Sequence, residues 1–416
     1  MRSIDPMYIG KDAISALLSY LKDYGQNRFA IVADGNTYGA LGERIERALK
    51  GAGYDTSTIL LDGDHVHTDE HQITHTLIHA PRGDCTFIAV GGGTVTDITR
   101  FVSFHTSRPF ISMPTAPSVD GFTSIGAPTV LAGVKKTVYC QPPIAIFADI
   151  DVLCAAPHDL VGAGYGDMIG KMTSVADWTL GSILWNEPFD DRMAERSKKA
   201  VAEVLKHTDA IGEQSPDGIR TLMDGLIESG FIMLEFGASR PASGTEHHIS
   251  HYWEMMHIRD DKPTQLHGAQ VAVGMVIAAR QYARLRQMSR EQMLERLEAA
   301  ELPSRSAEVA AIAEGYGEMA AELIRDNLPF LDMTEADFDA LKRRIADRWD
   351  DIQAIAAQVA DAETMQDWLR RAGTPSTAQE LGLSEEEVTA GLRYGHYLRE
   401  RFTIMKLSRI LDIPVE

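Results

Sequence analysis

The stretch Thr86-Phe-Ile-Ala-Val-Gly-Gly-Gly-Thr-Val-Thr-Asp97 runs from a short apolar segment through three consecutive glycines. The apolar segment predicts a buried strand, and residues 98–105 predict a helix after the glycines. Glycines here let backbone N–H groups approach a pyrophosphate closely, and a helix N-terminus attracts its charge. A tight turn without a ligand would use the same residues, and the spacing is not the standard G-x-G-x-x-G fingerprint.

The same alternation of strand and helix surrounds this stretch and predicts a parallel sheet of Rossmann type. Further strands are expected at residues 28–33, 57–61, 109–113 and 143–149. Residues 127–140 alternate apolar and polar side chains around Gly133, which predicts a β-hairpin. From about residue 159 the pattern is helical almost to the end, and Ser384-Glu-Glu-Glu387 predicts a capping box for a late helix.

We therefore expect an α/β chain of two domains, because 416 residues exceed one ordinary core. Residues 1–155 would form a Rossmann-like parallel-sheet domain with a β-hairpin that binds NAD(P). Residues 156–416 would form an all-helical domain that binds metal and substrate. A cleft between the two is the expected place for a site.

Composition sets limits on partners and location. Apolar and charged fractions of 44% and 24% are typical of a soluble globular protein. Three cysteines without zinc-type spacing indicate reduced thiols in a cytoplasm. We expect no secretion signal and no membrane span, since no stretch approaches about 20 apolar residues. The net charge of −20 argues against a nucleic-acid partner but allows a small phosphorylated substrate.

Histidines gather in a second notable segment, residues 240–254. His247 and His251 lie one helical turn apart, so both rings can share a face. His267 follows, and Asp167 lies far upstream. One carboxylate and two imidazoles with an open position suit a divalent Lewis acid. Paired histidines on a helix are more often ordinary surface or core residues, and a polar loop would also contain them.

Asp34 follows the strand predicted at residues 28–33. A carboxylate there can accept hydrogen bonds from an adenosine ribose and would repel a 2′-phosphate, which favours NAD over NADP. An ordinary Asx-turn residue explains Asp34 equally well.

The polar segment Pro114-Thr-Ala-Pro-Ser-Val-Asp-Gly-Phe-Thr-Ser124 follows another predicted strand. Strand ends of this kind face the ligand crevice in α/β sheets. Hydroxyls of Thr115, Ser118 and Ser124 can bond a cofactor, and Asp120 can bond a substrate hydroxyl. Taken alone, the segment would pass for a solvated loop.

Four motifs together resemble the sn-glycerol-1-phosphate dehydrogenase family, and its bacterial, AraM-like branch in particular. They are Gly91–Asp97, Pro114–Gly121, Gly164–Asp167 and Ser239–His251. The wider superfamily includes iron-containing alcohol dehydrogenases, glycerol dehydrogenase and dehydroquinate synthase. The resemblance therefore implies a dehydroquinate synthase-like fold, with an α/β domain followed by a helical one.

The resemblance also implies site residues. Asp167, His247 and His267 match metal ligands, whereas His251 and Asp120 match substrate contacts. Together with the pyrophosphate glycines and Asp34, the expected cofactor contacts are Gly91, Gly92, Gly93, Thr94, Val95, Thr96, Asp97, Thr115, Ala116, Pro117, Ser118 and Ser124. The substrate phosphate needs a cation, for which Lys171, Lys135 and Arg259 are candidates.

The family reduces dihydroxyacetone phosphate to sn-glycerol 1-phosphate with NADH or NADPH. The resemblance implies this reversible reaction here, with one divalent metal, nickel or zinc, and with His251 or water supplying the proton. It also favours a homodimer, as does the apolar segment 388–413, although burial within its own domain explains that segment nearly as well.

Three other functions stay open at this point. A dehydroquinate synthase would share NAD and a metal, but the histidine segment lacks the Gly-His-Thr pattern expected of it. A dehydrogenase for a polyol without phosphate, such as glycerol, is the second alternative. A metal- or nucleotide-binding protein without catalysis is the third.

Overall fold

The structure is a computed structural model that describes residues 4–63, 66–131 and 134–415. The chain forms two compact units, one of Met1–Met168 with Glu203–Gly237 and the other of Ile169–Ala202 with Ala238–Glu416. The long helix α7 (His158–Trp185) contributes residues to both units. The predicted division of roles near residue 155, with cofactor binding before it and metal binding after it, stays a prediction.

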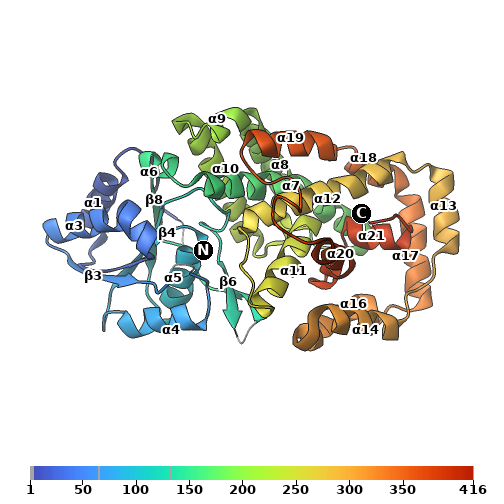
Figure 1. Ribbon diagram of the computed structural model, residues 1–416, viewed down its shortest axis with the longest axis horizontal. Coiled ribbons are helices and arrows are strands. Elements are labelled where there is room, and N and C mark those ends of the chain that lie inside the picture. Colours follow the sequence, from blue (N-terminus) through green and yellow to red (C-terminus); the bar gives the residue numbers. More distant parts are fainter. Residues whose placement is uncertain (1–3, 64–65, 132–133, 416) are drawn as a thin grey trace. The chain divides into compact units, whose positions relative to one another are not determined.

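The first unit contains a six-stranded sheet in the order β1-β8-β5-β4-β2-β3, and every neighbouring pair is parallel (Figure 1). The sheet confirms the predicted fold class. It also contains an edge strand, β1, that the sequence pattern did not predict. The strands are β1 Met7–Gly10, β2 Arg28–Ala33, β3 Asp55–Leu60, β4 Thr86–Gly91, β5 Phe110–Pro114 and β8 Ala145–Asp149.

Two apolar clusters cover the two faces of this sheet. Successive residues of β2 alternate between them, with Ile31 in one cluster and Val32 in the other. Helices α1 (Ala13–Tyr24) and α3 (Glu43–Gly51) pack on the first face, and α4 (Glu70–His79) and α5 (Gly93–His105) pack on the second. Helices on both faces explain why the central strands are apolar runs rather than alternating ones.

A separate antiparallel hairpin joins β6 (Gly126–Leu131) to β7 (Val134–Tyr139) and confirms the predicted hairpin. Gly133, which we expected in its turn, lies outside the described residues. Helices α6 (Ile150–Cys154), α9 (Thr208–Gly212) and α10 (Pro216–Phe236) belong to the first unit, and α8 (Asp191–Lys206) crosses its boundary.

The second unit is helical within the described residues, as predicted. Its helices α11 and α12 pack so closely that a Cβ at Gly274 would lie 2.5 Å from the carbonyl oxygen of Glu246. The α-helices of this unit from residue 245 onward are α11 Thr245–Arg259, α12 His267–Gln287, α13 Arg290–Ala299, α14 Arg305–Tyr316, α15 Ala320–Asp326, α16 Leu328–Leu331, α17 Glu335–Asp347, α18 Trp349–Ala356, α19 Ala362–Arg371, α20 Glu385–Tyr394 and α21 Ile404–Ile410.

Local signals explain several of these ends. The Ser384 hydroxyl accepts from the Glu387 backbone N–H at 3.2 Å, and the Glu387 carboxylate accepts from the Ser384 N–H at 2.9 Å. This pair confirms the predicted capping box. Helix α14 ends at Tyr316 because Gly317 adopts a φ of 55°, which favours glycine.

The late segment 388–413 is not one helix but α20, the short 3-10 helix η4 (Gly395–Tyr397) and α21. Apolar side chains such as Tyr397, Phe402 and Ile404 are buried within the second unit. This burial accounts for the apolar segment without a partner subunit, so the homodimer stays a prediction.

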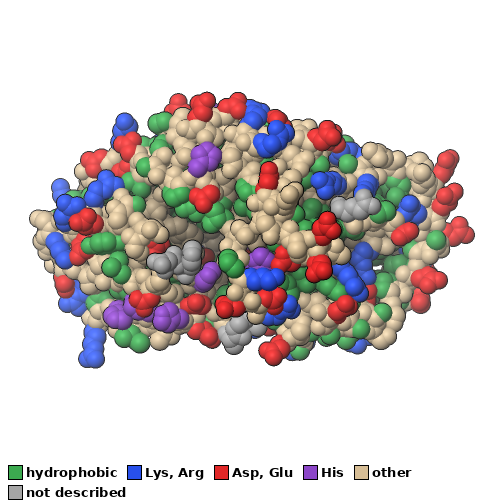
Figure 2. Space-filling view, viewed as in Figure 1, with side chains coloured by type: hydrophobic (Ala, Val, Ile, Leu, Met, Phe, Trp, Pro, Cys, Tyr) green, Lys and Arg blue, Asp and Glu red, His purple; other side chains and the backbone are tan. Residues whose placement is uncertain are grey.

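No helix among the described residues is both long and apolar enough to cross a membrane. On the face drawn in Figure 2, acidic and basic side chains are interspersed.

Candidate functional site

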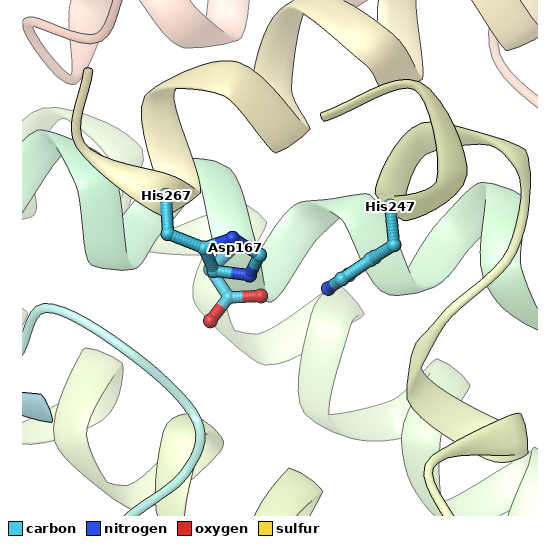
Figure 3. A group of neighbouring side chains, drawn as sticks. All are labelled: Asp167, His247 and His267. Carbon is cyan, nitrogen blue, oxygen red and sulfur yellow. The ribbon is translucent and has the colours of Figure 1, made fainter. Parts of the chain in front are cut away.

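Three residues from distant parts of the sequence form a candidate metal site. Asp167 lies on α7, His247 lies in the first turn of α11, and His267 begins α12. One oxygen of Asp167 and one ring nitrogen of each histidine all lie within 4.8 Å of one another. Figure 3 shows these three side chains and the helices that carry them. Metal–ligand distances are about 2.0–2.2 Å for such donors, so small side-chain shifts would bring all three to one ion.

The Asp167 carboxylate is fully buried and therefore needs compensation. The backbone N–H of Asp120 donates to Asp167 Oδ2 at 3.0 Å. The Asp120 side chain is itself fixed, because the Ser229 hydroxyl donates to Asp120 Oδ2 at 2.8 Å. The loop that we expected to contact substrate and cofactor is thus bonded directly to a candidate metal ligand.

His247 is supported from behind by the buried carboxylate of Glu246. His247 Nδ1 lies 2.8 Å from Glu246 Oε1, and the carboxylate also accepts from the Gly244 N–H at 2.6 Å and the Thr173 hydroxyl at 2.7 Å. Burial disfavours the charged form of this carboxylate and raises its pKa. The hydrogen bonds outweigh burial and hold the pKa of Glu246 below its usual value. With Nδ1–H donated to Glu246, Nε2 is the nitrogen with which His247 would bind a metal.

A second buried carboxylate, Asp177, fixes the start of α11. Its oxygens accept from the Thr245 N–H, the Ile404 N–H and the Tyr282 hydroxyl, each at 2.7 Å. Burial, together with the nearby charge of Glu246, raises the pKa of Asp177 to about 6. A carboxylate at a helix N-terminus satisfies otherwise orphan N–H groups and interacts favourably with the helix dipole.

His251 lies beside this group, one turn further along α11. Its ring stacks on the His267 ring at an interplanar angle of 20° and a centroid distance of 5.0 Å. His251 Nδ1 lies 3.4 Å from Glu254 Oε2, and His251, Glu254 and His267 form a second group whose donor atoms lie within 4.8 Å of one another. His267 therefore belongs to both groups, so geometry alone allows either set around it.

The predicted cofactor segments lie side by side at the carboxyl ends of β4 and β5. Gly91 ends β4, Gly92 precedes α5, and the Thr115 N–H donates to the Gly91 carbonyl at 3.3 Å. A Cβ at Gly92 would lie 3.4 Å from the Ser118 hydroxyl. The same segment packs closely on α7, because a Cβ at Gly164 of that helix would overlap the Pro117 carbonyl oxygen at 1.7 Å.

Other predicted cofactor residues have structural partners. Asp97 forms an ion pair with Arg100, which is fully buried and donates to the carbonyls of Gly121 at 2.6 Å and Gly126 at 2.9 Å. The Ser124 hydroxyl donates to the Gly121 carbonyl at 3.2 Å. Arg100 therefore organises the loop. The sequence did not lead us to predict this role, although the i,i+3 spacing of Arg100 from Asp97 was a visible signal.

Asp34 caps the short helix α2 (Gly35–Thr37), where its Oδ1 accepts from the Thr37 N–H at 2.8 Å. This is the turn role weighed above, and contact with a ribose stays a prediction. Of the candidate phosphate ligands, Lys171 is fully buried, and Arg259 pairs with Asp260 at 2.7 Å. The side chain of Lys135 lies outside the described residues.

The class of protein is defined by comparison with known families and folds. Residues 8–157 match the family model of iron-containing alcohol dehydrogenases. The solved NADH-dependent butanol dehydrogenase A of Thermotoga maritima has a TM-score of 0.63 at 13% identity, covering 100% of this chain and 98% of that one. Glycerol dehydrogenase of Schizosaccharomyces pombe has a TM-score of 0.61 at 16% identity, covering 98% and 87%. At these identities the likeness shows the fold, which is that of the iron-containing alcohol dehydrogenases and dehydroquinate synthase.

The particular family follows from closer relatives. Glycerol-1-phosphate dehydrogenase (NAD(P)+) of Bacillus subtilis is 35% identical over 407 residues, which cover 97% of this chain and 91% of the relative. The protein of the same name from Halalkalibacterium halodurans is 44% identical over 282 residues, 67% of this chain and 71% of that one. The chain belongs to the glycerol-1-phosphate dehydrogenase family, which confirms the resemblance found in its motifs, and it is an oxidoreductase.

Proposed function

We propose that this chain catalyses the reversible reduction of dihydroxyacetone phosphate to sn-glycerol 1-phosphate with NADH or NADPH. The observation that supports this most is the convergence of Asp167, His247 and His267 in a chain of the glycerol-1-phosphate dehydrogenase family. Neither a lyase nor an oxidation of unphosphorylated glycerol has an observation of its own in its favour.

The three proposed ligands fit a divalent metal. One carboxylate and two imidazoles suit nickel and zinc alike, and both remain candidates. We favour the Asp167 set over the Glu254 set because Asp167 is fully buried and His247 has Glu246 behind it, as metal-bound histidines usually do. A divalent cation held there would supply Lewis-acid polarisation of the substrate carbonyl.

The remaining roles fall to residues around this group. His251 would contact the substrate and transfer its proton, and Glu254 Oε2, which lies 3.4 Å from His251 Nδ1, would orient its ring. Asp120, fixed by Ser229, would accept a hydrogen bond from a substrate hydroxyl. Lys171, Lys135 and Arg259 remain candidates for the phosphate.

The cofactor would bind with its pyrophosphate at the N-terminus of α5. That helix begins directly after Gly92, so its first backbone N–H groups and its dipole are available to an anion. Asp34 would accept from the adenosine ribose with its second oxygen and would disfavour NADPH. We further propose a cytoplasmic homodimer, for which a dimer mass in light scattering at micromolar concentration is the check.

An assay with dihydroxyacetone phosphate and NADH on protein reconstituted with nickel or zinc tests the function. We expect oxidation of NADH and a product that is the 1-phosphate enantiomer in chiral analysis. Glycerol should be a far poorer substrate than glycerol 1-phosphate in the reverse direction. Formation of sn-glycerol 3-phosphate, or faster turnover of glycerol, would contradict the proposal, and release of inorganic phosphate from a carboxylated sugar phosphate would favour the lyase.

A further inference from the structure

A cavity of about 550 Å³ lies within the second unit, lined by none of the proposed metal, substrate or cofactor residues. Its walls come from α13, α14, α16, α17, η4 and α21. The helices among them are labelled at the right of Figure 1. Sites for small molecules usually measure about 300–1,000 Å³ and combine apolar walls with a few polar groups. The size of this cavity is therefore that of a ligand site.

The walls are largely apolar and partly aromatic. Trp185 packs behind them, with its ring stacked on Phe330 at a centroid distance of 4.1 Å and an interplanar angle of 9°. This stacking holds one aromatic wall in place and supplies a fluorescent reporter beside the cavity. The apolar side chains that line the cavity include Phe330, Leu331, Phe338, Leu341, Phe402 and Ile410.

A single lysine, Lys406, lies in this apolar setting and is only 8% exposed. Its Nζ donates to the His396 carbonyl at 2.7 Å and lies 4.3 Å from the centroid of the Phe330 ring. An ammonium carries three N–H donors, and among the described residues only one of them has a hydrogen bond. Burial lowers the pKa of Lys406 to about 7, with the charge of Arg409 acting in the same direction.

The charges of Glu308, Glu187 and Glu400 all act on Lys406, and Glu308, the one of the three that lines the cavity, is bonded elsewhere. Glu308 accepts from Arg409 through both oxygens, at 2.6 and 3.0 Å, and from the Tyr397 hydroxyl at 2.9 Å. Within the described residues, Lys406 has no carboxylate within 4.0 Å of its Nζ. A buried ammonium without a carboxylate at hydrogen-bond distance is costly, so an anion that reaches Nζ would favour the charged form of Lys406 and gain a strong, charge-assisted hydrogen bond.

We propose that this cavity is a second ligand site, which binds a small amphipathic monoanion with its apolar body against Phe330, Phe338 and Phe402 and its carboxylate on Lys406 Nζ. A cationic ligand would meet Lys406 and Arg409, and a neutral one would leave the ammonium without its partner. Exposed Glu295, Glu301 and Asp412 also line the cavity. One ammonium balances one negative charge, and these three carboxylates would repel a second, so the proposed ligand is a monoanion. The site is independent of the proposed function.

Calorimetric titration of the metal-loaded protein with decanoate tests this site, with decan-1-ol as the uncharged ligand of equal length. We expect one decanoate per chain, a change in tryptophan fluorescence, and weaker binding of decanol. Lys406→Met keeps an unbranched side chain, one atom shorter, but removes the charge, and it should weaken the binding of decanoate about 10- to 100-fold, as expected for loss of a charged hydrogen bond. Lys198→Met is the matched control, since Lys198 is an exposed lysine paired with Glu195 on α8.

Ala299→Phe provides an independent variant that fills the cavity from an exposed position while keeping Lys406. It should abolish binding of decanoate and decanol without lowering the melting temperature, and it carries the test if Lys406→Met does not fold. No saturable decanoate binding by the unchanged protein would overturn the proposal. Equal affinity in folded Lys406→Met, unchanged binding in Ala299→Phe, or many decanoates per chain would overturn it as well.

Discussion

The turn between β4 and α5 and the first turn of α11 both begin a helix beside a candidate site, but they are built by opposite means. At α5 the side chains are missing: Gly91, Gly92 and Gly93 present backbone N–H groups and no charge. At α11 charged side chains crowd together, and two buried carboxylates, Glu246 and Asp177, hold the helix start and His247. We therefore expect the glycine turn before α5 to be disrupted by adding a side chain. We expect the first turn of α11 to be disrupted by removing a charged group.

Removing a metal ligand should have the largest effect. Asp167→Asn keeps the size of the side chain but loses the charge that binds a cation. We expect bound metal below a tenth of the wild-type content and turnover near background, measured by elemental analysis and NADH oxidation on the same sample. Because Asp167 is buried, a melting curve must accompany the assay. A folded Asp167→Asn protein with full metal content would exclude Asp167 from the ligand set.

Adding a side chain to the glycine turn should have the next largest effect. A Cβ at Gly93 would lie 2.9 Å from Val119 Cγ2, and the larger Gly93→Val would also occupy the space that a pyrophosphate needs. We expect the KM for NADH to rise by about 10²-fold, corresponding to about 2.7 kcal/mol of lost binding. Metal content should stay normal, which separates this variant from those of α11. An unchanged KM would place the pyrophosphate elsewhere.

Weakening the support behind His247 should have an intermediate effect. Glu246→Gln keeps the shape of the side chain but replaces the charged acceptor of His247 Nδ1–H with a neutral one. Loss of such outer partners typically costs about 10–100-fold in metal affinity. A chelator competition assay on folded protein measures this directly. Equal affinity in both proteins would mean that Glu246 only fills space.

The cofactor preference should respond more mildly. Asp34→Ala should narrow any preference for NADH over NADPH by about tenfold, the value of one hydrogen bond and a repulsion of similar size. The ratio of kcat/KM for the two cofactors is the measurement. Because Asp34 also caps α2, the variant Thr37→Ala, which weakens the same turn, is the matched control. An equal change in both variants would assign Asp34 to the turn alone.

The smallest effect concerns the far end of α11. Hydrogen bonds from Lys262 and the Ser384 N–H lower the pKa of Glu387 to about 2, and Glu387 also contacts His257. Because the pKa of Glu387 is lower in the folded chain than in the unfolded chain, its carboxylate stabilises the fold at pH values above the unfolded pKa near 4.5. This contribution is lost as the pH falls toward 2. We expect Glu387→Gln to lower the free energy of unfolding, measured with urea, by about 1–2 kcal/mol at pH 7 and by less at pH 3.5. A difference independent of pH would contradict the assigned charge.

The same contrast explains how much the sequence alone could predict. The glycine turn, the parallel strands and the hairpin follow from local pattern, because neighbouring residues determine them. The support of His247 and of the start of α11 does not, since Thr173, Asp177 and Tyr282 lie on other helices and give no local signal. The edge strand β1 was missed because four residues, Met7–Gly10, are too few for a periodic pattern.

The candidate site was predicted in part. Family motifs named Asp167, His247 and His267, and the structure brings these three together. Residue spacing alone favoured pairing His247 with His251, one turn apart, and could not show that the His267 ring stacks on His251. The buried roles of Arg100 and Glu246 were not predicted, because a charged residue in a sequence is ordinarily expected at the surface.

The central claim is that Asp167, His247 and His267 hold the metal while His251 lies beside it and acts on the substrate. The most direct test compares metal content and turnover in His247→Ala and His251→Ala. We predict that His247→Ala loses metal and activity together, whereas His251→Ala keeps its metal and NADH binding but turns over about 10²- to 10⁴-fold more slowly. Loss of metal from His251→Ala with retention in His247→Ala would contradict the account and assign the ion to His251, Glu254 and His267.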